Sequence, residues 1–232
     1  MNRNFYLAAA MSAGLFAGCV STPPSPAGTL KVSYSTTLID RSRLNEAPTE
    51  VQLVQRETTG RNVAAQVGLN VLMMALGGGA GVSTFSKDDL AGDPIEGVVD
   101  RSNLANPVST GFVQSLQEAV SARMAEEGRW RDRSFTHPLV VGGGRATLVY
   151  DNLMGSEEPQ YQLALRLDVY KRREGNWPVA PRLVLCDGRS QTAQPLAQWA
   201  ASSYLGVQQE LQRMLGACQE KVVAGLPGLL ED

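Results

Sequence analysis

The side chains able to carry acid, base or metal chemistry are few and scattered along this chain of 232 residues. His137 is the sole histidine, so a histidine-based zinc site has no second imidazole. Two pairs of adjacent carboxylates stand in loop-like stretches, Asp88-Asp89 and Glu157-Glu158, where solvated side chains are expected rather than an acid–base pair. We therefore predict no enzyme activity and no metal site.

Motifs for nucleophiles and nucleotides are also missing. The sequence contains no G-x-S-x-G, H-E-x-x-H, P-loop or Rossmann pattern. The run Gly142-Gly143-Gly144-Arg145 lacks the Lys-Ser/Thr of a phosphate loop, and it precedes an expected strand rather than a helix. We expect no cofactor.

Composition excludes further classes. The 21 Lys+Arg against 23 Asp+Glu give a net charge of -2, which provides no overall attraction to nucleic acid. The 43% of hydrophobic residues is ordinary for a folded domain. The chain is therefore expected to fold around a core and not to bind nucleic acid.

The amino-terminal residues have the pattern of an export signal. Arg3 is followed by an uncharged run from Phe5 to Phe16, which is too short to span a bilayer. The stretch from Leu15 to Cys19 resembles the lipobox of bacterial lipoproteins. This resemblance implies cleavage before Cys19, a diacylglyceryl thioether on its sulfur and an acyl chain on its new amino group, which together form a stable membrane anchor.

The residues after the lipobox indicate where such an anchor would lie. Val20 is not acidic, whereas lipoproteins of this class commonly use an acidic residue there to stay in the inner membrane, so we expect outer-membrane sorting. Residues 19–28 contain three prolines and are expected to form an extended tether. The predicted organisation is a signal peptide over 1–18, the lipidated tether over 19–28 and a periplasmic domain over 29–232.

Two cysteines remain once Cys19 is assigned to lipid. Cys186 and Cys218 form an even pair in a compartment where disulfides persist, which favours a bridge between them. The alternative is two buried thiols that pack as small hydrophobic side chains.

Hydrophobic periodicity predicts an α+β fold, in which an antiparallel or mixed sheet carries two long amphipathic helices packed on one face. Asn106 and Pro107 begin the first helix, which Gly128 ends, while Gly225 and Pro227 close the second. The expected strands cover 29–39, 50–56, 146–151, 160–171 and 181–186, and the expected helices cover 107–127 and 194–224.

The order of these elements is similar to that of small sheet-and-helix periplasmic modules in several envelope lipoproteins. The likeness includes Gly128-Arg129-Trp130 just after a helix and a hairpin that leads into the carboxyl-terminal helix. Such modules include auxiliary lipoproteins of lipid-transport complexes and lipoprotein activators of peptidoglycan synthases. The resemblance implies an accessory role in the cell envelope.

The strand over 160–171 alternates, with Tyr161, Leu163, Leu165, Leu167 and Val169 on one face and Gln162, Arg166, Asp168 and Tyr170 on the other. Turn residues at 174–176 suggest that it forms a hairpin with the strand over 181–186. This hairpin carries a basic run that either contacts a partner or simply faces solvent. The candidate contact residues on it are Arg166, Lys171, Arg172 and Arg173.

An uncharged segment extends over the 25 residues from Asn62 to Ser86, and a long linker that overlaps its end is expected over 82–107. The segment fits a core helix that ends in a glycine loop, an arm that docks on a partner, or a membrane-associated element. Its candidate contact residues are Val63, Val67, Leu72, Met73, Gly77, Gly78, Gly79 and Gly81.

Together these patterns favour an outer-membrane lipoprotein whose periplasmic domain binds a partner within an envelope complex without catalysing a reaction. A lipid carrier or transport accessory and an envelope hydrolase of unfamiliar motif are the alternatives.

Overall fold

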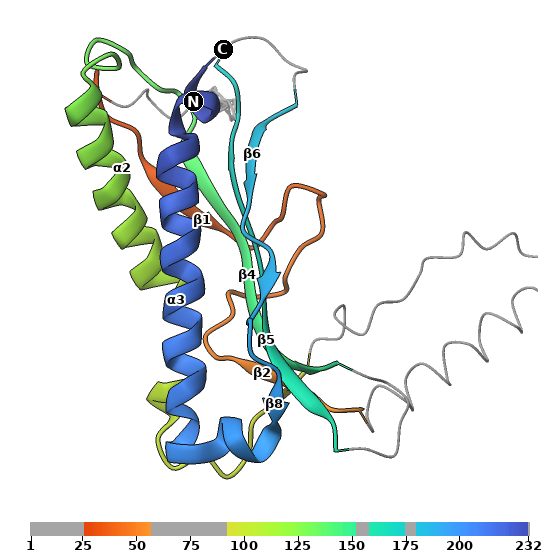
Figure 1. Ribbon diagram of the computed structural model, residues 1–232. Helices are drawn as coiled ribbons and strands as arrows, with labels where there is room; N and C mark the ends of the chain where they lie inside the picture. The colour runs from red at the N-terminus through yellow and green to blue at the C-terminus, as the bar shows by residue number, and fades with distance from the viewer. Residues whose placement is uncertain (1–25, 57–91, 152–157, 175–179, 232) are drawn as a thin grey trace, which may run out of the picture.

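The computed structural model describes residues 26–56, 92–151, 158–174 and 180–231. They form two layers, a mixed sheet and a pair of helices packed against one face of it (Figure 1). This arrangement confirms the fold class predicted from the sequence. The strands are β1 (Val32–Ser35), β2 (Gln52–Val54), β3 (Asp93–Pro94), β4 (Leu139–Tyr150), β5 (Gln160–Lys171), β6 (Arg182–Leu185), β7 (Gly188–Arg189) and β8 (Gln194–Pro195), and the helical elements are η2 (Arg101–Leu104), η3 (Val108–Phe112), α2 (Val113–Glu127) and α3 (Leu196–Leu230).

Two long antiparallel strands, β4 and β5, form the centre of the sheet. Their pairing extends from Leu139 opposite Lys171 to Tyr150 opposite Tyr161. Shorter strands complete both sides: β1 and β2 pair in parallel with successive parts of β4, and β6, β7 and β8 pair in turn with β5. Because both edges are built from short pieces, the loops between those pieces can fold over the central strands.

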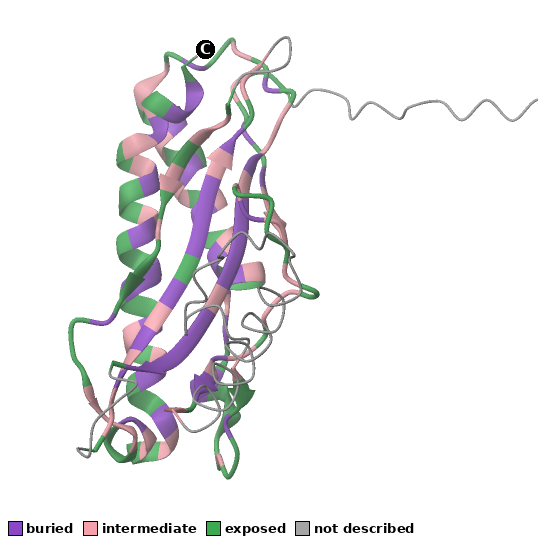
Figure 2. Ribbon diagram, turned by 90° about the vertical axis from the view of Figure 1, so that its right-hand side faces the viewer, coloured by how far each residue is buried: buried purple, intermediate pink, exposed green. Residues whose placement is uncertain are grey.

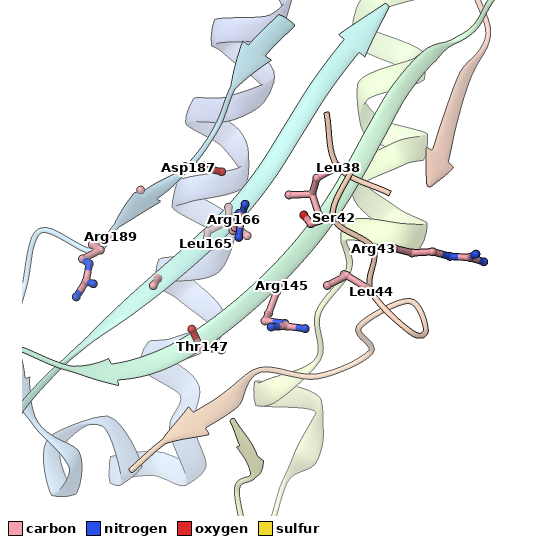
Figure 3. A pocket seen from close by; sticks show the side chains of 13 residues that line it. Leu38, Ser42, Arg43, Leu44, Arg145, Thr147, Leu165, Arg166, Asp187 and Arg189 are labelled. Atoms are coloured by element: carbon pink, nitrogen blue, oxygen red, sulfur yellow. The ribbon is translucent and has the colours of Figure 1, made fainter. Parts of the chain in front are cut away.

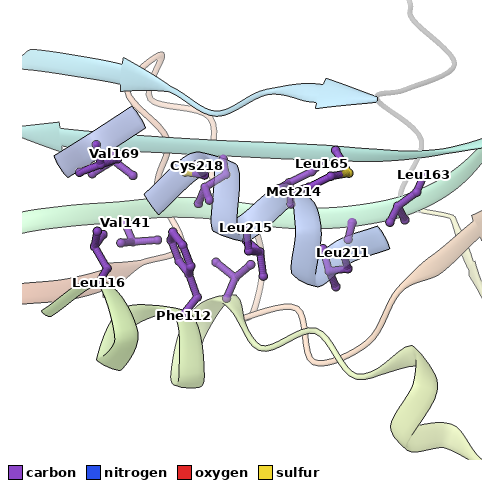
Figure 4. Close-up of a cluster of buried hydrophobic side chains, with 14 of the residues drawn as sticks. Phe112, Leu116, Val141, Leu163, Leu165, Val169, Leu211, Met214, Leu215 and Cys218 are labelled. Atoms are coloured by element: carbon purple, nitrogen blue, oxygen red, sulfur yellow. The ribbon is translucent and has the colours of Figure 1, made fainter. Parts of the chain in front are cut away.

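The core lies between the sheet and the two helices (Figure 4). Burial follows the central strands and the inner sides of the helices, while their outer sides are exposed (Figure 2). Each buried leucine in this layer contributes roughly 1.5–3 kcal/mol to folding. The buried apolar residues of β5 on this face are Tyr161, Leu163, Leu165, Leu167 and Val169, as the alternating pattern predicts.

The first predicted helix is present but changes type along its length: η3 (Val108–Phe112) is π-helical, and α2 continues from Val113 to Glu127. Asn106 accepts a hydrogen bond at its Oδ1 from the backbone N–H of Val108, at 3.2 Å, and so caps the helical segment. At the other end Gly128 is left-handed, with φ of 67°, and its N–H donates to the carbonyl of Met124. The polar cap and the glycine stop are both visible in the sequence.

Helix α3 differs from its prediction at both ends. It continues past Gly225 and Pro227 to Leu230, because Leu226, Leu229 and Leu230 are buried against the rest of the fold. Near its start the helix is interrupted at 201–204, where the backbone is non-helical. The predicted end at 225–227 is therefore wrong, since burial of the last turn outweighs the helix-breaking residues.

Strand β4 begins earlier than predicted. The glycines at 142–144, expected to precede a strand, lie inside it, and the register with β5 shifts between Gly143 and Arg145. Gly143 and Gly144 have φ of 79° and 89°, a region open to glycine, so they form a bulge that a residue with a side chain adopts only under strain. The strand thus continues through the glycines and changes its register with β5 there.

Other predicted boundaries are too broad. Of the strand expected over 29–39 only Val32–Ser35 pairs with the sheet, while 50–56 yields Gln52–Val54 and 181–186 yields Arg182–Leu185. The described part of the expected linker, from residue 92 onward, packs rather than extends, since Ile95 and Leu104 are buried. These apolar side chains anchor it beside β2.

The end of the expected tether already belongs to the fold. The N–H of Gly28 donates to the carbonyl of Arg133 at 2.9 Å, and the hydroxyl of Thr29 donates to the carbonyl of Pro26 at 2.6 Å. Among the described helices, none combines the length and the apolar character needed to cross a bilayer.

The predicted disulfide is present. Cys186, just after β6, is bonded to Cys218 of α3 across a sequence separation of 32, and their Cα atoms lie 5.4 Å apart. Lys221 reinforces this contact, because its Nζ donates to the carbonyl of Leu185 at 2.7 Å. The bond therefore ties an edge strand of the sheet to the helix that covers it.

Candidate functional site

A groove of about 600 Å³ lies on the face of the sheet opposite the helices (Figure 3). We call it the arginine groove. Its walls come from the loop after β1, from the central strands and from the segment around β7. The lining residues are Leu38, Ser42, Arg43, Leu44, Gly143, Arg145, Thr147, Ala164, Leu165, Arg166, Asp187, Gly188 and Arg189.

Arginines on three neighbouring strands face this groove. Arg145 of β4 and Arg166 of β5 are direct cross-strand partners, so their side chains leave the sheet on the same face. Arg189 of β7 is opposite Ala164, two residues along β5 from Arg166. Arg43 stands at the rim, with its side chain pointing outward (Figure 3). The lining thus carries four arginines and one aspartate, in a chain whose net charge is -2.

The bulge in β4 directs Arg145 into the groove. Gly142 pairs with Asp168 and Gly143 with Leu167, but the next pair is Arg145 with Arg166 because Gly144 is the extra residue. In an unbroken ladder Arg145 would oppose Leu165 and face the buried side. The extra glycine therefore moves a cation from the core to the groove.

Small side chains leave room between the arginines. Ala164 and Thr147 are cross-strand partners on the floor of the groove, beside the arginine pair. Leu38 and Leu44 form an apolar wall (Figure 3). A ligand in this groove would meet positive charge and an apolar surface together.

The loop over 36–44 that supplies this wall rests on the glycines of β4. A Cβ at Gly142 would lie 2.7 Å from the carbonyl oxygen of Thr37, and one at Gly143 would lie 2.9 Å from Leu38. The hydroxyl of Tyr34 also donates to the carbonyl of Gly143, at 2.9 Å. Only glycine allows so close an approach, so the bulge and the wall are parts of one structure.

Aspartates hold the same loop in place. Asp168 is buried and accepts the N–H of Ile39 at 2.8 Å, while Asp40 pairs with Nη2 of Arg166 at 2.7 Å. Hydrogen bonds from Ser42, followed by the charge of Arg166, lower the pKa of Asp40. Desolvation, with the negative charges of Asp187 and Asp40 adding to it, raises the pKa of Asp168, although the hydrogen bond from Ile39 and the charge of Arg166 oppose this. These carboxylates organise the groove wall.

The predicted basic hairpin is not one surface. Arg166 lies in the arginine groove, whereas Lys171 is on the opposite face, buried, with Nζ 2.5 Å from Glu174. The pKa of Glu174 is lowered because hydrogen bonds from Lys171 and two backbone N–H groups outweigh its burial, the largest single influence. Arg172 is exposed and Arg173 half-buried. Burial thus removes the Lys171 side chain from any exposed contact face.

The other candidate residues either have surroundings that indicate no chemical role or lie outside the described residues. His137 is half-buried, and its backbone N–H donates to Glu174 at 3.3 Å, which fits a structural loop position. In the part of the chain that the structure describes, no cluster of three or more His, Cys, Asp or Glu is placed to hold a metal. The candidates outside the described residues are Cys19, Val63, Val67, Leu72, Met73, Gly77, Gly78, Gly79, Gly81, Asp88, Asp89 and Glu157.

The sequence reasoning identified only one arginine of the groove. Arg145 follows a glycine run that was judged by its fit to a phosphate loop, and Arg189 lies in a short segment with no periodicity. A Gly-Gly-Gly-Arg run inside an apolar strand is itself a bulge signal. That signal marks Arg145, but the pairing partner of a strand is not visible in one sequence.

Comparison with known proteins gives no relationship: no family model, curated protein sequence or solved structure matches the chain. The functional argument therefore depends on the groove and on the sequence pattern.

Proposed function

We propose that this protein is an outer-membrane lipoprotein, anchored through Cys19, whose periplasmic domain acts as a non-enzymatic binding or assembly component of a cell-envelope complex. The single observation that supports a binding role best is the arginine groove on the sheet face that the helices leave uncovered. The lipobox-like stretch ending at Cys19 supports the anchor.

The charge of the groove supports a partner rather than a packing role. Arg145 lies opposite Arg166, and like charges directly across a ladder destabilise the pair. Arginine is also enriched where proteins bind one another, since its planar head pairs with carboxylates at two points. Four arginines gathered in one groove of a chain whose net charge is -2 favour an acidic ligand.

The disulfide supports the proposed compartment. Bonds such as Cys186–Cys218 persist in oxidising spaces, of which the bacterial periplasm is one. Together with the export signal, it favours action on the periplasmic side of the envelope.

A lipid carrier is the second candidate. Leu38 and Leu44 line the same groove as the arginines. An anionic lipid has a charged headgroup that could contact the arginines and an acyl chain that could contact the leucines. The space between helices and sheet is filled by core side chains, so lipid would have to bind at the open face. A volume of about 600 Å³ suits a headgroup or a short peptide better than two acyl chains.

The anchor is tested by Cys19→Ser. Wild-type protein should take up labelled palmitate and sediment with outer membranes, whereas the variant should do neither. Unlabelled wild-type protein would contradict the anchor.

The binding role is tested by crosslinking in cells and mild-detergent purification, followed by mass spectrometry of proteins and lipids. The groove variant Arg145→Gln/Arg189→Gln spares Arg166, which pairs with Asp40, and Arg213→Gln on α3 is the matched charge control. A defined envelope protein should accompany wild type and control but not the groove variant. Lipid without a stoichiometric protein would instead favour the carrier.

A further inference from the structure

The arginines of the groove form a row across three strands rather than a ring around one point. Arg145 and Arg166 are directly opposite, and Arg166 is diagonal to Arg189 through the Ala164–Arg189 pair. Directly opposite residues in an antiparallel ladder are about 5 Å apart and diagonal neighbours about 7–8 Å. The row therefore extends over roughly 12 Å.

This spacing favours an extended anion. One phosphate or sulfate group concentrates its charge at one point, whereas a row of arginines on three strands offers separate contacts along its length. An extended peptide places side chains of residues i and i+2 on one side, about 6.5–7 Å apart. Carboxylates at alternate positions of an extended peptide thus match the spacing of the row, in which Arg166 is also paired with Asp40.

The rest of the groove suits a peptide as well. Ala164 and Thr147 lower the floor beneath the row, so an extended chain can approach the sheet. Leu38 and Leu44 form a wall for an apolar side chain between the acidic ones. Asp187 lowers the net positive charge of the groove. Its carboxylate accepts a hydrogen bond from the backbone N–H of Leu167, at 2.8 Å.

We propose that the arginine groove binds an extended acidic segment of a protein partner, with Asp or Glu at alternate positions. This inference rests on the proposed function, in which the groove is the partner contact. The recognition is by side chains on a sheet face, because the strands that line the groove are paired with one another.

The test uses a fluorescein-labelled heptapeptide with Glu at its second, fourth and sixth positions and Val or Leu between them. Fluorescence anisotropy follows its binding to the full chain in mild detergent. The expected result is saturable binding that weakens as salt is raised, because exposed charges are screened. The matched peptide with Gln at the same positions should not bind.

Single variants assign the binding to the row. Arg145→Gln, Arg166→Gln and Arg189→Gln should each weaken peptide binding about tenfold, the loss expected for one charge-assisted contact. Arg213→Gln removes an equal charge from α3 and should leave binding unchanged. Thermal melting of every variant shows whether the fold is intact. Arg189 belongs to the two-residue strand β7, so its substitution is the one least expected to disturb folding.

Three results would overturn the inference: binding of the Gln peptide as tight as that of the Glu peptide, binding by all three arginine variants as tight as that of wild type, or displacement of the peptide by millimolar inorganic phosphate. Binding of phosphatidylglycerol vesicles through these arginines, with no peptide binding, would also overturn it and assign the groove to lipid.

The two proposals fail separately. If the groove variant loses its partner in cells but the peptide does not bind, the acidic-segment inference is wrong and the proposed function stands. If the peptide binds through the row but the groove variant keeps its partner in cells, the proposed function is wrong.

Discussion

Arg145 and Arg166 are directly opposite each other in the central ladder of the sheet, and both face the same groove. The extra residue Gly144 creates this pairing, because without it Arg145 would oppose Leu165 on the buried face. The pairing of two like charges is unfavourable by itself and useful when an anion lies between or above them. The bulge is thus the structural origin of the proposed site.

The bulge should tolerate no side chain at Gly144. A Cβ there would lie 2.4 Å from Val108, and φ is 89°. We expect Gly144→Ala to lower the free energy of unfolding by about 2–4 kcal/mol, from overpacking and backbone strain together. Urea unfolding followed by circular dichroism measures the change. Gly216→Ala on the exposed side of α3 is the control and should be neutral or stabilising; equal effects of the two substitutions would contradict this account.

The disulfide should contribute a large part of the stability. Replacing Cys186 and Cys218 by Ser opens a loop with a separation of 32 residues, which the loop-entropy model values at about 3.5–4 kcal/mol. The denaturation midpoint of the double variant should fall to that of reduced wild type. Alkylation of either cysteine in native protein without reductant would show that the bond is absent.

The stability of the fold should depend on the ionisation of Asp168. Desolvation raises its pKa, so the folded chain keeps a proton that the unfolded chain releases, and the free energy of unfolding falls as pH rises through that interval. Asp168→Asn keeps an oxygen to accept the N–H of Ile39 but carries no charge. It should be more stable than wild type at neutral pH, and the difference should disappear below about pH 3, where the Asp168 carboxyl is protonated in both the folded and the unfolded chain. Parallel unfolding curves across this range test it; an unchanged or lower neutral-pH stability would count against the prediction.

The interruption of α3 should store strain that Asn103 offsets. Ser202, Ser203 and Tyr204 have φ of 51°, 54° and 66°, and the buried Asn103 amide donates to the carbonyl of Ser203 at 2.9 Å. Asn103→Ala should cost about 1–3 kcal/mol. Ser202→Gly should stabilise by up to about 1 kcal/mol, because glycine is not strained there. Thermal melts with opposite shifts would support this account, and destabilisation by Ser202→Gly would contradict it.

Elements with a clear period could be predicted from the sequence. The alternation in β5, the cap at Asn106 and the stop at Gly128 are local signals, and each is present in the structure. The disulfide followed from counting cysteines in a chain expected to be exported. Local chemistry decides these features, so one sequence is enough.

The groove could not be predicted because it depends on pairing. Arg145, Arg166 and Arg189 belong to separate segments, and only the register of β4, β5 and β7 brings them to one face. The glycine run was expected to precede the strand, since glycine is depleted in strands, yet it lies inside β4 and lets the 36–44 loop approach the sheet. Lys171 was a candidate contact residue of the hairpin, but it is buried, because its aliphatic stem can pack in the core and its charge pairs with Glu174.

The most direct test of the central claim, that the arginine groove contacts the partner, is photo-crosslinking in cells. A benzophenone amino acid is placed at Ser42, an exposed residue of the groove lining, and, as a control, at Gln212 on the outer side of α3. The account predicts a crosslinked envelope protein from position 42 that disappears when Arg145 and Arg189 are also changed to Gln, and none from position 212. Crosslinks to the same protein from position 212 alone would contradict it and place the contact on the helical face.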